Sequence, residues 1–235
     1  MGNRTNEQHA LLTDYGKDTA YSEAFHTLFA NIRFNWNNDK AEHSHIHDVH
    51  SLLLTTPSNY DDQAAMAANL AIVAAQSSTP TLLVDADLRA PKLEQRFGLG
   101  KNPGLSDLLQ EEGSITSERV TSCLQTTFVP GLKLIGAGTS TAQGALLLLS
   151  PKLQDAITCF GDVLAREAEE SRPGIVIFHS APVLAGADAS LIGALTEQTV
   201  LTIVVGRTTR AQAKQAQEQL ERAHTRLSGI VMLKP

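Results

Sequence analysis

The sequence contains little cysteine, few aromatic residues and no excess of positive charge. Its two cysteines, Cys123 and Cys159, have none of the paired spacing that is typical of a zinc site. We therefore expect a reducing compartment, in which a disulfide between them would be unusual. The formal net charge is −6 at pH 7 over 235 residues. This balance argues against a basic surface for nucleic acid or for an acidic membrane.

Long apolar runs are also missing. No stretch reaches the ~18 to 20 apolar residues that a membrane-spanning helix requires. The first 18 residues are largely polar and lack the apolar centre of a secretion signal. We expect a cytoplasmic protein without direct membrane insertion, which a partner chain would have to bring to a membrane.

The apolar residues that are present follow two alternating patterns. Short apolar runs predict buried strands, and the amphipathic or alanine-rich stretches between them predict helices. The predicted strands include 51–56, 81–87, 131–138 and 174–182, and the predicted helices include 21–36, 64–76, 151–170 and 209–227. This alternation indicates an α/β fold, with a mostly parallel sheet covered by helices on both faces in three α/β/α layers. We expect a flexible segment over 1–20 and a single domain over 21–235.

One bend between a strand and a helix lies where α/β proteins bind phosphate. The stretch TTPSNYDDQAAMAANLAIVAAQ covers residues 55–76. A phosphate loop needs glycines that turn backbone amides toward the ligand, with a lysine and a Ser or Thr hydroxyl for the terminal phosphates and magnesium. Residues 59–64 read Asn-Tyr-Asp-Asp-Gln-Ala and contain no glycine, lysine, serine or threonine. The bend therefore has the position of a phosphate loop without its ligands.

Several segments together carry a likeness to a known family. They are SEAFHTLFANIRF, LLVDADLRAPKLEQRFGLGKNPGLSDLL, GLKLIGAGTS, IVIFHSAPVLAGADAS and VLTIVVGRTTRAQAKQAQEQLERAHTRLSGIVM. Over residues 21–233 the chain resembles the cytoplasmic tyrosine kinases of bacterial capsule and exopolysaccharide synthesis, which belong to the deviant-Walker group of P-loop ATPases. The resemblance implies a P-loop NTPase-like fold that holds ATP and Mg²⁺. It also implies that Asp85 and Asp87, in the second acidic motif, coordinate magnesium and act as catalytic acids.

The phosphate loop departs from the family pattern, which reads glycine-acid-glycine-lysine-serine-threonine. The corresponding residues here are Tyr60, Asp61, Asp62, Gln63, Ala64 and Ala65. Gln63 replaces the lysine, and Ala64 and Ala65 replace the hydroxyls. Each charge-assisted hydrogen bond contributes about 1.5–3 kcal/mol, so these losses should weaken ATP binding by roughly three to four decades. We expect no cofactor, and ATP with Mg²⁺ only if another cation replaces the lysine.

The second and third motifs give mixed indications. Asp85 and Asp87 are kept, but residues of this type also serve as helix caps, or they could pair with Arg89 nearby. His179 stands where the family has an aspartate, and a neutral imidazole does not hold hydrated Mg²⁺ as a carboxylate does. His179 is therefore either a candidate general base or a hydrogen-bonded structural residue.

A histidine-rich segment precedes the first predicted strand. His43, His45 and His47 alternate along it and would share one face if the segment were extended. Imidazoles suit zinc, copper or nickel, so a metal-responsive module is one interpretation. The other is a solvated linker, because no cysteine supports a metal site there.

These patterns favour a pseudokinase, a non-catalytic relative of the capsule and exopolysaccharide tyrosine kinases that acts by binding other proteins. The expected partner is a membrane chain-length or export protein, or an intact paralogous kinase subunit. Two alternatives are an active ATP-dependent tyrosine kinase or ATPase with an atypical loop, and the metal-responsive module. The family's ring-forming glutamate-arginine-arginine pattern keeps Glu23 here, while His26 and Phe29 replace the arginines. Whether the chain forms an oligomer is left open.

Overall fold

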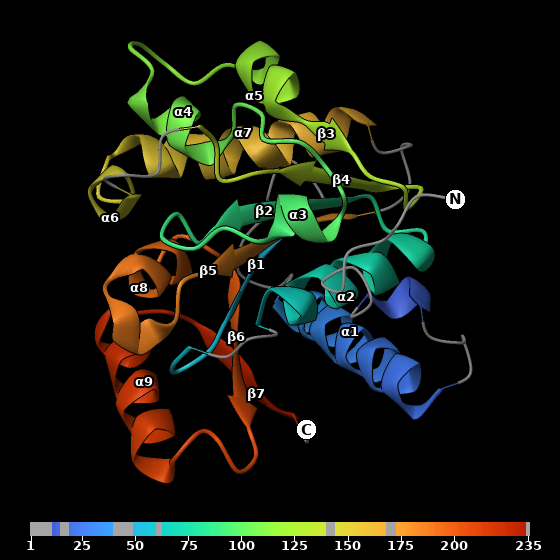
Figure 1. Ribbon diagram of the computed structural model, residues 1–235, viewed down its shortest axis with the longest axis vertical. Coiled ribbons are helices and arrows are strands. Elements are labelled where there is room, and N and C mark those ends of the chain that lie inside the picture. The colour runs from blue at the N-terminus through green and yellow to red at the C-terminus, as the bar shows by residue number, and fades with distance from the viewer. Residues whose placement is uncertain are drawn as a thin grey trace.

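The computed structural model describes residues 11–14, 19–39, 49–59, 63–139, 144–167 and 173–233. Within these residues, a seven-stranded sheet runs through the centre of the molecule (Figure 1). The strands lie in the order β3-β4-β2-β5-β1-β6-β7. Their bounds are β1 Val49–Thr55, β2 Thr81–Ala86, β3 Gln125–Thr126, β4 Leu132–Ile135, β5 Gly174–Ser180, β6 Gln198–Val204 and β7 Leu227–Leu233. Neighbouring strands are parallel except for β3 and β4. The mostly parallel sheet predicted from the sequence is confirmed.

Helices cover both faces of the sheet, and each face has its own apolar core (Figure 1). One face carries η2 Leu12–Asp14, α1 Ala20–Asp39, α2 Gln63–Gln76 and α3 Leu93–Arg96. The other face carries α4 Leu105–Gln110, α5 Ser117–Cys123, α6 Gly144–Leu147, α7 Lys152–Glu167, η3 Val183–Ala185, α8 Asp188–Gly193 and α9 Arg210–Arg222. The three-layer α/β/α arrangement is therefore also confirmed.

The central strands are apolar because both of their faces are covered. β5 pairs with β1 on one side and β2 on the other, and all of its residues are buried. In β1, Leu53 packs into the core under α7 and α8, whereas Leu52 and Leu54 pack into the core under α1 and α2. A continuous apolar run is what a parallel strand between two helical layers requires.

α2 lies close against the sheet because its side chains are small. Every residue from Ala64 to Ala75 is buried, and many of them are alanines. α1 covers α2 with an apolar face that includes Phe25, Phe29 and Trp36, as its helical spacing predicts. None of the described helices, α2 included, is both long and apolar enough to cross a membrane.

Of the segment over 1–20 that the sequence predicts to be flexible, residues 1–10 and 15–18 lie outside the described residues, whereas 11–14 are described. Leu12–Asp14 form a 3-10 helix, and Leu11 and Leu12 are 1% and 4% exposed. The backbone amide of Leu12 donates a hydrogen bond of 2.8 Å to the side-chain oxygen of Asn69 in α2. Two adjacent leucines therefore suffice to fix this part of a mainly polar segment against the core, because they bury apolar surface beside a buried hydrogen bond.

Candidate functional site

The three acidic or imidazole side chains singled out in the sequence lie together at the carboxyl edge of the sheet. Asp85 near the end of β2 is in register with His179 near the end of β5, and His179 is also in register with Leu54 of β1. Asp87 follows β2 directly. In open α/β sheets this edge is where ligands bind. The second and third sequence motifs thus meet at one edge, because the parallel strands that carry them end there.

Gln63 connects the end of β1, the start of α2 and the second acidic motif. Its side-chain oxygen accepts a hydrogen bond of 2.9 Å from the hydroxyl of Thr56. Its side-chain nitrogen donates a long hydrogen bond of 3.5 Å to a carboxylate oxygen of Asp87. Ala64 and Ala65, which follow it, are 0% and 3% exposed. Tyr60, Asp61 and Asp62, the rest of the loop, lie outside the described residues. The Gln63 amide is therefore bonded on both of its polar atoms, to Thr56 and to Asp87.

Asp85 is fully buried, and its carboxylate accepts hydrogen bonds from backbone amides. One oxygen accepts hydrogen bonds of 3.0 Å and 2.9 Å from the amides of Lys92 and Leu93 at the start of α3. The other accepts a bond of 3.2 Å from the amide of Asp87. Burial raises the pKa of Asp85 to about 7, although the amide hydrogen bonds act in the opposite direction. Asp85 thus holds the start of a helix in place.

Asp87 fixes the turn that follows β2. Its carboxylate accepts hydrogen bonds of 3.2 Å and 3.1 Å from the amides of Arg89 and Ala90. Such side-chain-to-backbone bonds are typical of an aspartate that initiates a turn. Burial raises the pKa of Asp87, and the nearby Asp188 carboxylate raises it further. Both aspartates of the second motif are therefore engaged with their own backbone.

Arg89 pairs with a residue that the sequence patterns did not reveal. Its guanidinium forms two hydrogen bonds to Asp188 in α8, of 2.7 Å and 3.1 Å, and Asp188 is 1% exposed. This bond raises the pKa of Arg89. Gly186 permits the approach, since a Cβ there would lie 2.8 Å from a guanidinium nitrogen. The partners are 99 positions apart in the sequence, so only the acidic residue in GADAS gave any signal.

His179 is buried and uncharged. Its pKa is lowered to about 3, mainly by burial and to a smaller extent by the positive charges of Arg96 and Lys92. It lines a small hollow with Thr56, Gln63 and other residues of β1, α2 and β6, and this hollow is too narrow for a water molecule. Magnesium prefers hard oxygen ligands and keeps several waters. The neutral imidazole of His179 therefore supplies no hard oxygen ligand at this edge.

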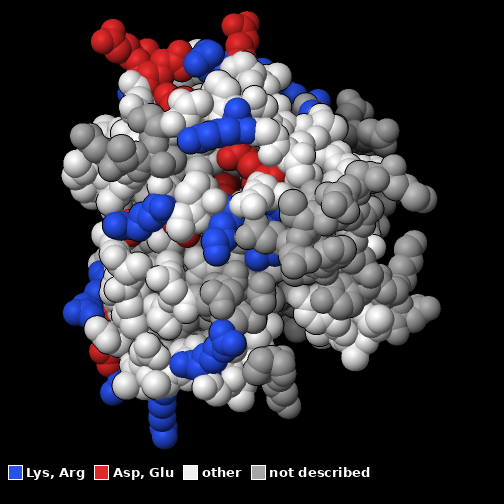
Figure 2. Space-filling view, in the orientation of Figure 1, with Lys and Arg blue, Asp and Glu red and all other residues white. Residues whose placement is uncertain are grey.

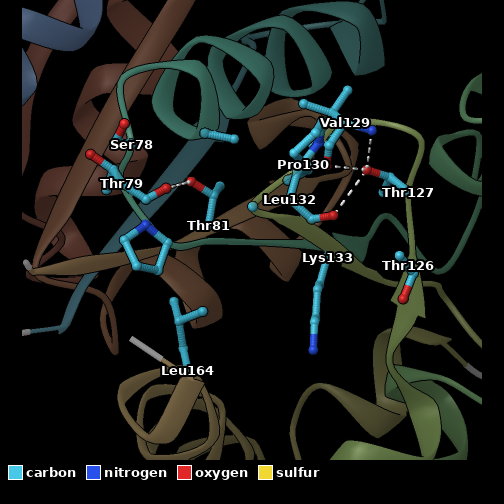
Figure 3. A pocket seen from close by; sticks show the side chains of 13 residues that line it. Ser78, Thr79, Thr81, Thr126, Thr127, Val129, Pro130, Leu132, Lys133 and Leu164 are labelled. Carbon is cyan, nitrogen blue, oxygen red and sulfur yellow. Dashed lines mark hydrogen bonds between the residues drawn. The ribbon is translucent and has the colours of Figure 1, made fainter. Parts of the chain in front are cut away.

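A larger cavity lies at the opposite, amino edge of the sheet (Figure 3). Its volume is about 300 Å³, and its walls include the starts of β2 and β4, at Thr81 and Leu132. The Thr81 hydroxyl already donates to the carbonyl of Thr79 at 2.7 Å. The Thr127 hydroxyl likewise bonds backbone groups of its own loop. Both hydroxyls are bonded to backbone groups nearby, so they give no evidence of a bound ligand.

The segment NPGLSDLL packs backbone to backbone on the glycine-rich end of β4. The amides of Leu105 and Ser106 donate to the carbonyls of Gly136 and Ala137, both at 2.9 Å. A Cβ on Gly104 would lie 2.2 Å from the Gly136 oxygen. Asp107 accepts from the amides of Gly104 and Thr139 at 2.8 Å and 2.9 Å. The glycines here permit close packing of two loops.

Charge is interspersed over the face shown in Figure 2. Basic side chains are spread across it, and acidic side chains gather at the top of the view, over α4 and α5, whose connecting segment includes Glu111 and Glu112. A nucleic-acid surface would need a basic stripe. The candidate metal ligands His43, His45 and His47 lie outside the described residues. Within the described part of the chain, no group of three or more His, Cys, Asp or Glu side chains could hold a metal ion.

Comparison with known sequences finds bacterial tyrosine kinases. The chain is 31% identical over 211 residues to the tyrosine-protein kinase YwqD of Bacillus subtilis. The matched residues cover 90% of this chain and 80% of that protein. It is 28% identical over 184 residues to the tyrosine-protein kinase ptk of Acinetobacter johnsonii, with 77% of this chain covered. It spans only 23% of the length of that second protein. No family model matches the chain.

Comparison with solved structures also finds bacterial tyrosine kinase domains. The kinase domain of the Escherichia coli tyrosine kinase ETK has a TM-score of 0.80 at 20% identity, covering 100% of this chain and 82% of that one. The BceF tyrosine kinase domain has a TM-score of 0.72 at 28% identity, covering 89% and 76%. The septum site-determining protein MinD of Pyrococcus horikoshii has a TM-score of 0.54 at 14% identity, with 78% and 70% covered. The fold is that of a P-loop NTPase.

Proposed function

Since the chain belongs to the family of bacterial tyrosine-protein kinases, we propose that it is a non-catalytic member that acts by binding other proteins. The observation that carries the proposal is the bonding of Gln63. Its amide joins Thr56 to Asp87 where the family pattern has a lysine. A neutral side chain already bonded on both of its polar atoms supplies no charge to a polyphosphate. ATP and Mg²⁺ are therefore not cofactors in this proposal.

The remaining groups at the edge support the same proposal. Asp85 and Asp87 accept backbone amides, and His179 is uncharged above pH ~3 because burial disfavours the imidazolium. Each missing charge-assisted contact removes about 1.5–3 kcal/mol of binding free energy. A micromolar nucleotide site would thereby become millimolar or weaker, since about 1.4 kcal/mol corresponds to a tenfold change in affinity.

The proposed setting is the cytoplasmic side of capsule or exopolysaccharide polymerisation and export. The partner would be an intact tyrosine kinase subunit or a membrane chain-length or export protein. This chain would regulate the partner by binding at a site that a kinase domain of the family otherwise occupies. The chain matches about a quarter of one relative and four fifths of another, so the surrounding protein context differs among relatives. A kinase-like fold that lacks the lysine and hydroxyls of the family's phosphate loop suits such a role.

Isothermal titration with magnesium-ATP tests the proposal. We expect no saturable binding below roughly millimolar concentration, for the energetic reason given above. A restored variant carries Tyr60→Gly, Asp62→Gly, Gln63→Lys, Ala64→Ser and Ala65→Thr. It should bind ATP at least about tenfold more tightly, because amides, lysine and hydroxyl again face the phosphates.

A matched control carries the same substitutions except Gln63→Lys. It should recover less affinity than the full variant if the missing lysine dominates. Micromolar ATP binding by the natural chain, together with phosphate transfer to tyrosine, would overturn the proposal. That result would favour an active kinase with an atypical loop.

A further inference from the structure

A chain of hydrogen bonds joins residues 11–14, α1 and α2 through one buried amide. The backbone amide of Leu12 donates to the Asn69 side-chain oxygen at 2.8 Å. The Asn69 side-chain nitrogen donates to the phenol oxygen of Tyr21 at 3.0 Å. Asn69 is 0% exposed, whereas Tyr21 is 38% exposed. A partly exposed tyrosine thus contributes to the bonding that holds residues 11–14 on the core.

The two bonds depend on each other because they use opposite ends of one amide. A buried amide is held in one orientation by the groups that satisfy its oxygen and its nitrogen. The Tyr21 ring is positioned by an edge contact with Phe25, with ring centroids 5.1 Å apart. Leu11 and Leu12 are nearly fully buried beyond this amide. A change at the phenol oxygen should therefore reach the segment that carries these leucines.

We propose that Tyr21 is a phosphorylation site for an active tyrosine kinase, and that its modification loosens residues 11–14 from α2. The proposal extends the proposed function, in which an intact kinase is a partner of this chain. In the reaction the phenol oxygen attacks the γ-phosphorus of ATP. The bond from that phosphorus to the β-bridging oxygen breaks, ADP leaves with the bonding electrons, and the phenolic proton passes to a base of the kinase or to water.

A phosphate on this oxygen cannot take the place of the phenol beside Asn69. The modification adds about −1.5 to −2 charge at neutral pH. Burying that charge beside a fully buried amide would require its desolvation, which is strongly unfavourable. The side chain should instead turn toward solvent, and the Asn69 nitrogen then loses its bond to Tyr21. Loss of a buried partner of this kind should raise the opening equilibrium of residues 11–14 by roughly tenfold to a hundredfold.

α1 should keep its structure during this change. Tyr21 lies in the first turn of Ala20–Asp39. Negative charge at a helix N-terminus is favourable because it complements the helix dipole. The buried face of α1, which includes Phe29 and Trp36, lies further along the helix. The effect is therefore expected to be confined to the contact between residues 11–14 and Asn69.

Phosphorylation in vitro tests the site. The full chain is incubated with magnesium-ATP and a purified active kinase of the family that phosphorylates its own tyrosines, and the products are mapped by mass spectrometry. We expect phosphate on Tyr21, and at least a tenfold loss of that modification in Tyr21→Phe. The matched control Tyr15→Phe should keep it. Modification of Tyr15 or Tyr60 without Tyr21, or of no tyrosine, overturns the proposal.

Hydrogen exchange tests the consequence. The amide of Leu12 should exchange about tenfold to a hundredfold faster in the phosphorylated chain than in the unmodified chain, in proportion to the opening equilibrium. Tyr21→Phe keeps the ring and removes the phenol oxygen that accepts from Asn69 without adding charge, so it should show a smaller increase in the same amide. Unchanged exchange at Leu12 in the phosphorylated chain would overturn the release.

The outcomes separate this inference from the proposed function. A reaction without added kinase reports whether the chain phosphorylates itself, and the ATP titration reports whether it binds nucleotide. Self-phosphorylation on Tyr21 would overturn the non-catalytic role and leave Tyr21 as the acceptor. An unmodified Tyr21 in a chain that does not bind ATP would overturn only the phosphorylation site.

Discussion

Asp85 and His179 are neighbours on adjacent strands, and burial affects their titration in opposite senses. Burial raises the pKa of Asp85 to about 7 and lowers the pKa of His179 to about 3. In both cases burial disfavours the charged form. Between these two values each side chain is mainly neutral. These two side chains therefore add little charge to this edge of the sheet at mildly acidic pH.

The pH dependence of stability should report the buried Asp85. Its folded-state pKa is raised above the ordinary value of 3.8, so its contribution to stability is fully present below that value and is lost as pH rises through about 7. From about pH 4 to pH 8, the unfolding free energy of the natural chain should fall relative to Asp85→Asn by up to roughly 4 kcal/mol. Urea unfolding at several pH values measures this difference. His179 is present in both proteins, so its opposite dependence cancels. A difference that stays constant with pH would contradict the prediction.

At the scale of single residues, the sequence predicted positions better than bonds. Asp85 and His179 could be placed at one edge because parallel strands end together. The two alternatives for Asp87, capping or pairing with Arg89, could not be resolved, since its backbone partners depend on the turn that follows. Asp188 was missed because a bond across 99 positions depends on the packing of α8 on the sheet. Local patterns do not contain that packing.

At the scale of elements, the contact between NPGLSDLL and the end of β4 should be highly sensitive to a single methyl group. Gly104→Ala would place a Cβ 2.2 Å from the backbone oxygen of Gly136, which has no flexible side chain to move aside. We expect a loss of roughly 1–3 kcal/mol in unfolding free energy, as for other overpacked sites. The matched control is Gly100→Ala, where a Cβ would meet nothing within 4 Å. Equal urea midpoints for the two variants would contradict this prediction.

Element types were easier to predict than element ends. The predicted helix over 209–227 is α9, which begins at Arg210 and ends at Arg222. The end comes early because His224 adopts a positive φ of 56°, which turns the chain toward β7. A helical pattern of charged and apolar residues gives no sign of that turn. The short 3-10 helix at Leu12–Asp14 was missed for a related reason, since two leucines are too few to form a periodic pattern.

At the scale of the whole molecule, thermal stability should respond weakly to nucleotide. A ligand that binds only the folded state stabilises it by RT ln(1 + [L]/Kd), so about 1 mM magnesium-ATP and a millimolar Kd give only ~0.4 kcal/mol. For a chain of 235 residues this corresponds to a Tm shift of about 1–2 °C. In the restored-loop variant each tenfold gain in affinity should add roughly 3–6 °C. Differential scanning calorimetry measures both shifts, and a large shift in the natural chain would count against a non-catalytic role.

Among the residues that the structure describes, the sheet separates two apolar cores that share no side chains. A damaging substitution under α7 can therefore influence the layer of α1 and α2 only by displacing the strands between them. Mutations at distant sites without shared neighbours usually have additive effects, whereas neighbours do not. In a genetic screen, suppressors of a defect in one layer should consequently arise within that same layer, and epistasis across the sheet should be rare.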